Sequence, residues 1–164
     1  MKKFNWPLMS NNITQNDKEI LIKFIKSSDK FTNGEKVKQF EKKWSQWLGV
    51  KYSTFVNSGA SANLVSLKIL SELEKNKSEV IVPAFTWSSD VVSIINSGFK
   101  PIFVDINLKN LALDEESVKK KINKKTAAIF LTHAMGFMGL SKNFLNYINK
   151  KKIFLIEDTC ESHG

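Results

Sequence analysis

Short, unbroken apolar runs alternate with helical patterns through the second two-thirds of the chain, and this alternation restricts the possible folds most strongly. The runs are rich in β-branched and aromatic residues, which favours strands. They are Glu79–Pro83, Pro101–Asp105, Ala127–Thr132 and Ile153–Asp158. Strands that are apolar throughout are typical of a sheet that is buried on both faces. The sequence therefore predicts an α/β fold with a mostly parallel sheet and helices on both faces.

Apolar residues at helical spacing predict helices between and before these strands. The predicted helices are Asp17–Ser27, Lys36–Leu48, Ala60–Lys75, a helix through Val91 and Ile95 that stops at Gly98, Ser117–Ile122 and Leu140–Ile148. Residues 1–16 are expected to form a polar N-terminal arm in which Trp6-Pro7-Leu8 is the apolar element. Residues 17–164 are expected to form one domain, since 164 residues suffice for a single core.

The chain carries a net charge of +9, which raises the question of nucleic-acid binding. It contains no arginine, the side chain that most often reads bases and phosphates, and its lysines fall mainly at predicted helix ends and loops. We therefore expect no nucleic-acid partner. No run reaches the roughly 18 apolar residues of a membrane span. The single cysteine, Cys160, fits a reducing compartment, so a cytoplasmic protein is expected.

A predicted strand, turn and helix around Asn57-Ser58-Gly59 provide a possible anion site. Lys51–Val56 has the composition of a strand, and the helix follows from Ala60. Gly59 can adopt a positive φ and so let a ligand approach the backbone closely. Free N–H groups at the helix start, with the Ser58 and Ser61 hydroxyls, would suit a phosphate. An ordinary helix capped by Ser58 is the alternative interpretation.

In open α/β sheets, ligands bind at the carboxyl ends of the strands. The residues expected there are Ser58–Ser61, Ala84-Phe85-Thr86-Trp87, Asp105, His133, Asp158 and Glu161. Together they offer an anion cradle, an aromatic plate and a carboxylate. A flat, phosphorylated ring with a nitrogen that must stay protonated would use all three, and pyridoxal phosphate is such a molecule. Asp158 is the candidate partner of the ring nitrogen.

Four motifs in order resemble those of the DegT/StrS family of fold-type-I pyridoxal-phosphate enzymes, which act on nucleotide-linked keto-sugars. They are Asn57–Leu64, Val82–Trp87, Pro101–Ile106 and Ile156–Ser162. The resemblance implies that the chain is part of the large domain of such an enzyme, with pyridoxal 5'-phosphate or pyridoxamine 5'-phosphate as cofactor. It also implies a homodimer for the full-length enzyme, and a role in deoxy-sugar, amino-sugar or surface-polysaccharide synthesis.

The resemblance also implies a role for each matching residue. Ser58, Gly59, Ala60 and Ser61 would hold the cofactor phosphate, Trp87 would stack on the ring, Asp158 would pair with its nitrogen, and Glu161 would approach the ring hydroxyl or the substrate. His133 is a candidate substrate contact, and no metal is expected.

Two positions depart from the common family pattern. Many members have Thr where this chain has Ala60, and most aminotransferases have Gln where it has Glu161. With glutamate at position 161, the last motif resembles that of the sugar 3-dehydratase subgroup. In those enzymes a histidine replaces the lysine that is linked to the cofactor. That lysine or histidine is expected beyond Gly164, followed by a small C-terminal domain, so this chain is expected to be an incomplete, inactive N-terminal part.

Three functions follow as alternatives: an aminotransferase for a nucleotide-linked keto-sugar, a 3-dehydratase with the same site, and a non-catalytic basic α/β binding module. The third would bind polyanions in a salt-sensitive way.

Overall fold

A computed structural model describes residues 11–162, which divide into two compact units between Phe55 and Val56. The described part of the first unit is residues 11–55, and that of the second is residues 56–162. Trp6-Pro7-Leu8, the apolar element predicted for the N-terminal arm, lies outside the described residues. Within residues 11–162, no helix combines the length and the apolar character needed to cross a membrane.

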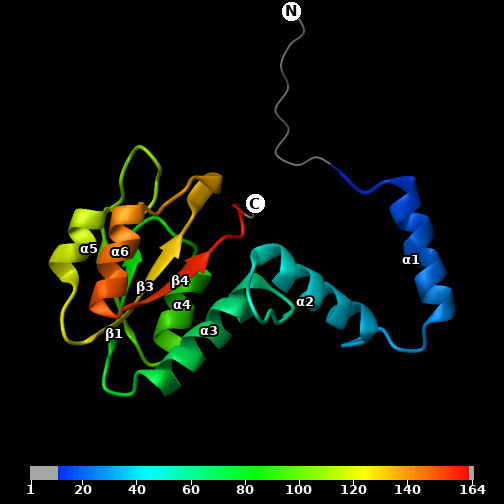
Figure 1. The fold of residues 1–164 in the computed structure, drawn as a ribbon, viewed down its shortest axis with the longest axis horizontal. Helices are drawn as coiled ribbons and strands as arrows, with labels where there is room; N and C mark the ends of the chain where they lie inside the picture. Colours follow the sequence, from blue (N-terminus) through cyan, green and yellow to red (C-terminus); the bar gives the residue numbers. More distant parts are fainter. Residues whose placement is uncertain (1–10, 163–164) are drawn as a thin grey trace, which may run out of the picture. The chain divides into compact units, whose positions relative to one another are not determined.

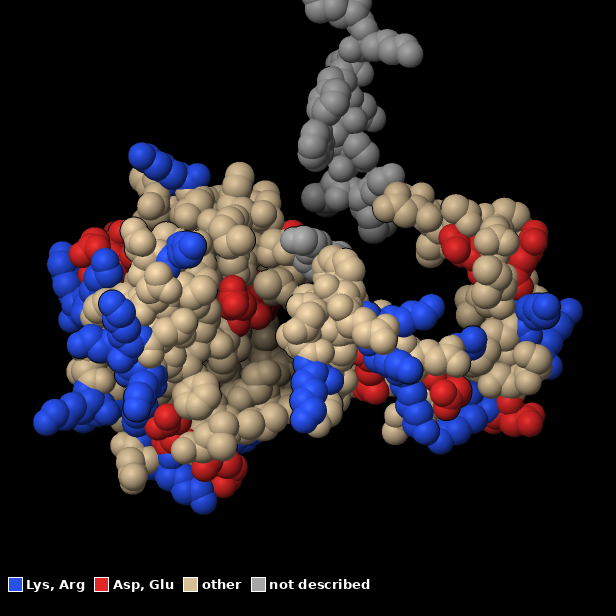
Figure 2. Space-filling view, viewed as in Figure 1, with Lys and Arg blue, Asp and Glu red and all other residues tan. Residues whose placement is uncertain are grey.

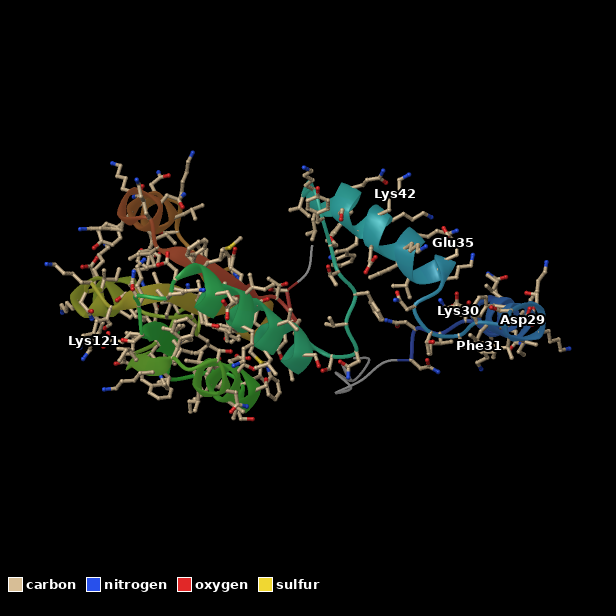
Figure 3. All side chains as sticks on the ribbon, turned by 90° about the horizontal axis from the view of Figure 1, so that it is seen from below. Asp29, Lys30, Phe31, Glu35, Lys42 and Lys121 are labelled. Carbon is tan, nitrogen blue, oxygen red and sulfur yellow. The ribbon has the colours of Figure 1, made fainter. Side chains whose placement is uncertain are left out.

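The first unit contains two helices, α1 (Gln15–Ser27) and α2 (Glu35–Leu48), close to the predicted ranges. A capping box starts α1: Asp17 donates its backbone N–H to Thr14 Oγ1 at 3.2 Å, and Thr14 returns its own N–H to the Asp17 carboxylate at 2.8 Å. Figure 3 shows Asp29, Lys30 and Phe31 on the loop that joins the two helices. In that loop Phe31 meets Phe24 of α1 edge to face. This contact packs the start of the loop against α1.

The strand predicted at Lys51–Val56 does not form. The segment uses its polar groups against α2 instead: Phe55 donates its backbone N–H to Glu41 at 2.8 Å, and Ser45 donates its hydroxyl to Ser53 at 2.9 Å. A strand requires a neighbour that pairs with its backbone, and the described chain provides none for this segment. The prediction was wrong because a β-branched composition shows that a segment can form a strand. It does not show that another strand is available to pair with it.

The second unit is built on a parallel sheet of four strands in the order β2-β1-β3-β4. The strands are β1 (Glu79–Pro83), β2 (Lys100–Val104), β3 (Thr126–Thr132) and β4 (Phe154–Asp158). Each lies within a residue of its predicted bounds. In register, Ile81 pairs with Ile102, and Ile129 pairs with Leu155. The prediction of a parallel α/β sheet is confirmed.

Two helices cover each face of this sheet (Figure 1). One pair is α3 (Gly59–Leu73) and α4 (Ser88–Asn96), and the other is α5 (Glu115–Lys121) and α6 (Lys142–Lys151). Successive strand residues face opposite sides. Phe130 of β3 therefore packs in the same cluster as Leu67 of α3 and Ile94 of α4, while Ile129 packs with Val118 of α5 and Ile148 of α6. The two apolar clusters hold the strands in place from both sides.

Lysines gather over α5 and α6, as Figure 2 shows. The last turn of α5 carries Lys119, Lys120 and Lys121, and the last turn of α6 carries Lys150 and Lys151. A positive charge there interacts favourably with the negative end of the helix dipole, and α5 also begins with two glutamates. The lysines at the C-terminal ends of α5 and α6 therefore stabilise these helices, which accounts for part of the net positive charge.

Candidate functional site

The carboxyl ends of β1, β3 and β4 meet at one edge of the sheet, because the strands are parallel. A cavity of about 270 Å³ opens there. Its lining consists of Phe85, Thr86, Trp87, Thr132, Ala134, Met135 and Glu161. The Trp87 residue is 57% exposed, so its indole is not part of the core and can face a ligand. The structure thus brings Trp87 and Glu161, both predicted from the sequence, to one cavity.

Asp158, the last residue of β4, is buried at the same edge. Its Oδ2 accepts a hydrogen bond from Asn63 Nδ2 at 3.0 Å, and its Oδ1 accepts one from the Cys160 backbone N–H at 3.0 Å. Burial acts to raise the pKa of Asp158, but these two hydrogen bonds, with those of the Cys160 and Asp90 side chains, outweigh it and leave the pKa below its ordinary value. The carboxylate is therefore ionised at neutral pH, as required of a partner for a protonated ring nitrogen.

A second buried carboxylate, Asp90, lies between Asp158 and Trp87. Its Oδ1 accepts from Asn63 Nδ2 at 2.8 Å. Its Oδ2 accepts from the Thr86 hydroxyl at 2.5 Å, the Thr132 hydroxyl at 3.1 Å and the Trp87 backbone N–H at 3.2 Å. Burial, and then the charge of Asp158, raises the pKa of Asp90. Asp90 and Asn63 thus connect the aromatic plate to the carboxylate at the end of β4.

Reasoning from the sequence missed both connecting residues, Asn63 and Asp90, although each leaves a signal. Asn63 lies four residues before the buried Leu67, and Asp90 lies four residues before the buried Ile94. Each is therefore a polar residue on the apolar face of its helix. A buried polar side chain at such a position requires a hydrogen-bonding partner, which points to a network.

The start of α3 forms an N-cap, as one of the two interpretations of this turn predicts. Ser58 Oγ accepts from the Ser61 backbone N–H at 3.2 Å and donates to the Ser61 hydroxyl at 3.1 Å. Gly59 does not use the positive φ that is open to glycine: it is the first residue of the helix, where φ is negative, and it is not among the residues with positive φ. A Cβ at Gly59 would lie 3.0 Å from Cys160 Sγ, so glycine here permits close packing against the segment that follows β4.

Ser58, Gly59 and Ala60 are exposed, and Ser61 is half-buried. The first N–H groups of a helix have no carbonyl partner inside it, so the start of α3 can hold an anion. That these four residues bind the cofactor phosphate stays a prediction.

His133 is buried, and both of its ring nitrogens are engaged. Nδ1 accepts from the Gly139 backbone N–H at 3.1 Å, so the proton of a neutral ring is on Nε2, which lies 2.9 Å from Glu157 Oε2. These contacts tie the loop after β3 to β4. The substrate contact predicted for His133 stays a prediction, and the residues that line the cavity do not include it.

The fold and the site define an α/β protein with a cavity at the carboxyl edge of a parallel sheet, bordered by an exposed aromatic ring and linked through hydrogen bonds to a buried carboxylate. The model of the DegT/DnrJ/EryC1/StrS aminotransferase family matches residues 11–164. The chain belongs to this family. The family resemblance of the four sequence motifs is thereby confirmed.

Curated relatives match nearly the whole chain. It is 40% identical, over 98% of its length, to a GDP-4-keto-6-deoxy-D-mannose 3-dehydratase of Yersinia pseudotuberculosis. It is 30% identical, over 96% of its length, to a GDP-perosamine synthase of Vibrio cholerae. The match covers 42% of each relative, so the chain spans less than half the length of the curated relatives it resembles.

A solved structure shows the same fold. The GDP-4-keto-6-deoxy-D-mannose-3-dehydratase of Escherichia coli, solved with bound hydrated pyridoxal phosphate, superposes with a TM-score of 0.88 at 33% identity. That match covers 98% of this chain and 42% of the other. The expected architecture, part of the large domain of a fold-type-I enzyme, is confirmed.

Proposed function

We propose that this chain supplies the cofactor-binding face of a pyridoxal-phosphate enzyme that acts on a nucleotide-linked keto-sugar. The observation that carries the proposal is Asp158: a buried carboxylate with a lowered pKa, at the end of β4 and linked to the cavity wall by Asn63 and Asp90. A buried charge is unfavourable unless it is paired, and the protonated ring nitrogen of the cofactor would pair with it.

The residues present fit this cofactor. Trp87 offers an aromatic face beside the cavity, and the start of α3 offers N–H groups and hydroxyls for a phosphate. When bound, pyridoxal phosphate would act as an electron sink: its ring would withdraw the electrons that are released when a bond of the substrate breaks. Asp158 would keep the ring nitrogen protonated. Trp87 would stack on the face of the ring and keep it in place.

Glu161 would lie next to the reacting part of the cofactor. Its carboxylate lines the cavity and accepts a hydrogen bond from the Met135 backbone N–H at 2.6 Å. This bond fixes one carboxylate oxygen, and the exposed side chain leaves the other able to contact the ring hydroxyl or the substrate. Glutamate here, together with the similarity to the Yersinia 3-dehydratase, supports loss of a 3-hydroxyl as water rather than amino transfer.

The remainder of the proposal follows the family. The enzyme would be a cytoplasmic homodimer that acts in deoxy-sugar, amino-sugar or surface-polysaccharide synthesis. Reading the coding frame past Gly164 would decide the chemistry: a lysine roughly 25 residues on would favour amino transfer, and a histidine would favour 3-dehydration.

Binding of pyridoxal 5'-phosphate to the full-length protein tests the cofactor assignment. Titration followed by the visible absorbance of the cofactor should give saturable binding to the wild type and much weaker binding to Asp158→Asn, which removes the charge and keeps the size. Asp29→Asn, at an exposed carboxylate of the first unit, is the matched control and should bind like the wild type. Equal affinity of the Asp158→Asn variant and the wild type would overturn the proposal.

A further inference from the structure

The Asn63 side chain lies between two buried carboxylates that come from different elements. Its Nδ2 donates to Asp90 of α4 at 2.8 Å and to Asp158 of β4 at 3.0 Å. Ionised carboxylates accept hydrogen bonds and donate none, so the amide must present its NH₂ group to both. Both hydrogens of that group are then used, and the side chain has one possible orientation.

No lysine or histidine neutralises this carboxylate pair in the part of the chain that the structure describes: neither Asp90 nor Asp158 forms a salt bridge within residues 11–162. The titratable groups that face Asp158 are Asp90, from α4, and Cys160, from the segment after β4, and neither carries a positive charge. Two like charges that are buried together destabilise each other. Asn63 is the side chain that donates a hydrogen bond to both carboxylates, in addition to the donors that each has of its own.

Asp90 also holds the other side of the cavity. It accepts the backbone N–H of Trp87 and the hydroxyls of Thr86 and Thr132, three residues of the cavity wall. A movement of Asp90 toward or away from Asp158 would therefore shift the aromatic plate relative to the carboxylate. Asn63 is bonded to both carboxylates and so links their positions.

We propose that Asn63 is a positioning residue: by donating to both carboxylates it aims Asp158 at the cofactor ring nitrogen and couples it to Asp90, which anchors the Trp87 segment. This inference rests on the proposed function for the cofactor, but its electrostatic part concerns residues of this chain alone. The directions of the two pKa shifts are compatible with it: burial acts to raise the pKa of Asp158, but hydrogen bonds, of which the Asn63 bond is the largest, lower it, whereas burial and the Asp158 charge raise the pKa of Asp90.

The substitution Asn63→Leu tests the proposal, because leucine has a similar size and no donor. Without the amide, Asp158 loses a hydrogen bond that lowers its pKa, so the pKa of Asp158 rises. Carboxyl ¹³C NMR of the full-length, cofactor-free protein, labelled at aspartate, should show Asp158 titrating at higher pH in the variant. The control Asn143→Leu, at an exposed position of α6, should leave that titration unchanged. An Asp158 carboxyl that titrates identically in the wild type and Asn63→Leu overturns the proposal.

The affinity for pyridoxal 5'-phosphate gives the second measurement. Between pH 5.5 and 8.5 the wild type should bind with nearly constant Kd, whereas Asn63→Leu should lose affinity at least tenfold as the pH falls, because Asp158 becomes protonated. A merely structural role would weaken binding equally at every pH, and that result overturns the proposal. If the wild type shows no binding while the NMR shift is present, the proposed function fails and the electrostatic inference stands.

The double variant Asn63→Leu/Asp90→Asn separates repulsion from packing. Removing the Asp90 charge should restore the flat pH profile of binding that Asn63→Leu loses, because the repelling charge is gone. Additive losses in the double variant would overturn the proposal. If Asn63→Leu does not fold, Asn63→Ser, which is polar but too short to reach both carboxylates, is measured in its place with the same expected results.

Discussion

Glu161 accepts a hydrogen bond from the backbone N–H of Met135 at 2.6 Å, and this bond joins the segment after β4 to the loop after β3. The loop turns sharply at this point: Met135 has φ 57° and Gly136 has φ 81°. The two segments approach so closely that a Cβ at Gly136 would lie 3.0 Å from the Glu161 carbonyl oxygen. One wall of the cavity therefore depends on this contact.

Gly136→Ala should destabilise the protein more than Gly98→Ala. Both glycines have a similar positive φ, 81° and 86°, so both substitutions carry the strain of about 1 kcal/mol that alanine has in this region. A Cβ at Gly98 meets nothing within 4 Å, whereas one at Gly136 meets backbone. Urea unfolding would measure the difference, and equal losses would contradict the contact.

Trp87→Ala should weaken binding of pyridoxal 5'-phosphate at least tenfold with little change in stability, because the indole is mostly exposed and borders the cavity. Trp47→Ala is the matched control, since Trp47 of α2 is 56% exposed and Trp87 is 57% exposed. Absorbance titration of the full-length proteins gives both affinities. If the two variants bind equally well, Trp87 does not stack on the cofactor.

Asp90 should make the stability fall as the pH rises above 3.8, the ordinary pKa of an aspartate. Burial raises its folded-state pKa, so the folded protein binds the proton more tightly than the unfolded chain and loses that advantage as the pH rises through the folded pKa. Asp158 has the opposite sign: its pKa is lowered, and the stability it contributes is lost as the pH falls below 3.8. Its hydrogen bonds, not burial, determine that sign.

The substitution Asp90→Asn should remove the decline above pH 3.8 while the decline at lower pH remains. Denaturant unfolding at intervals from pH 3 to pH 8 would measure both slopes, with Asp105→Asn as the control at an exposed carboxylate. A decline of the same size in Asp90→Asn would show that another group causes it.

Cys160 should react slowly for an exposed thiol. Its hydrogen bond to Asp158, followed by burial, raises its pKa from 9.0 to about 11. This shift lowers the thiolate fraction at pH 8 about 100-fold, and the greater nucleophilicity of a more basic thiolate leaves a rate about tenfold lower. Iodoacetamide labelling measures this rate. Asp158→Asn should accelerate labelling, and an unchanged rate would show that Asp158 does not govern the thiol.

Phe130→Ala should reduce the free energy of unfolding by about 3–5 kcal/mol, because the side chain is fully buried between β3 and the α3/α4 pair. Phe103→Ala should cost less than about 1 kcal/mol, since Phe103 lies on the edge strand β2 and is 51% exposed. Urea unfolding of both variants tests where the core is. Similar losses would contradict the placement of Phe130 at its centre.

The sequence alone determined the elements of the second unit and its class. The apolar run of β1 was located to the residue, and α3 begins directly after its predicted cap, Ser58, because apolar periodicity and capping are properties of neighbouring residues. That Trp87 and Glu161 lie at the same edge of the sheet could be predicted, because the segments after parallel strands meet there.

Only the tertiary structure decided which polar residues meet inside that edge. Asn63 and Asp90 are 27 residues apart, and Asn63 and Asp158 are 95 residues apart, so no local pattern relates them. The same limit applies to Lys51–Val56, whose composition suits a strand although its backbone hydrogen-bonds to the Glu41 side chain. Local chemistry specifies what a segment can form, whereas hydrogen-bond partners distant in sequence decide what it does form.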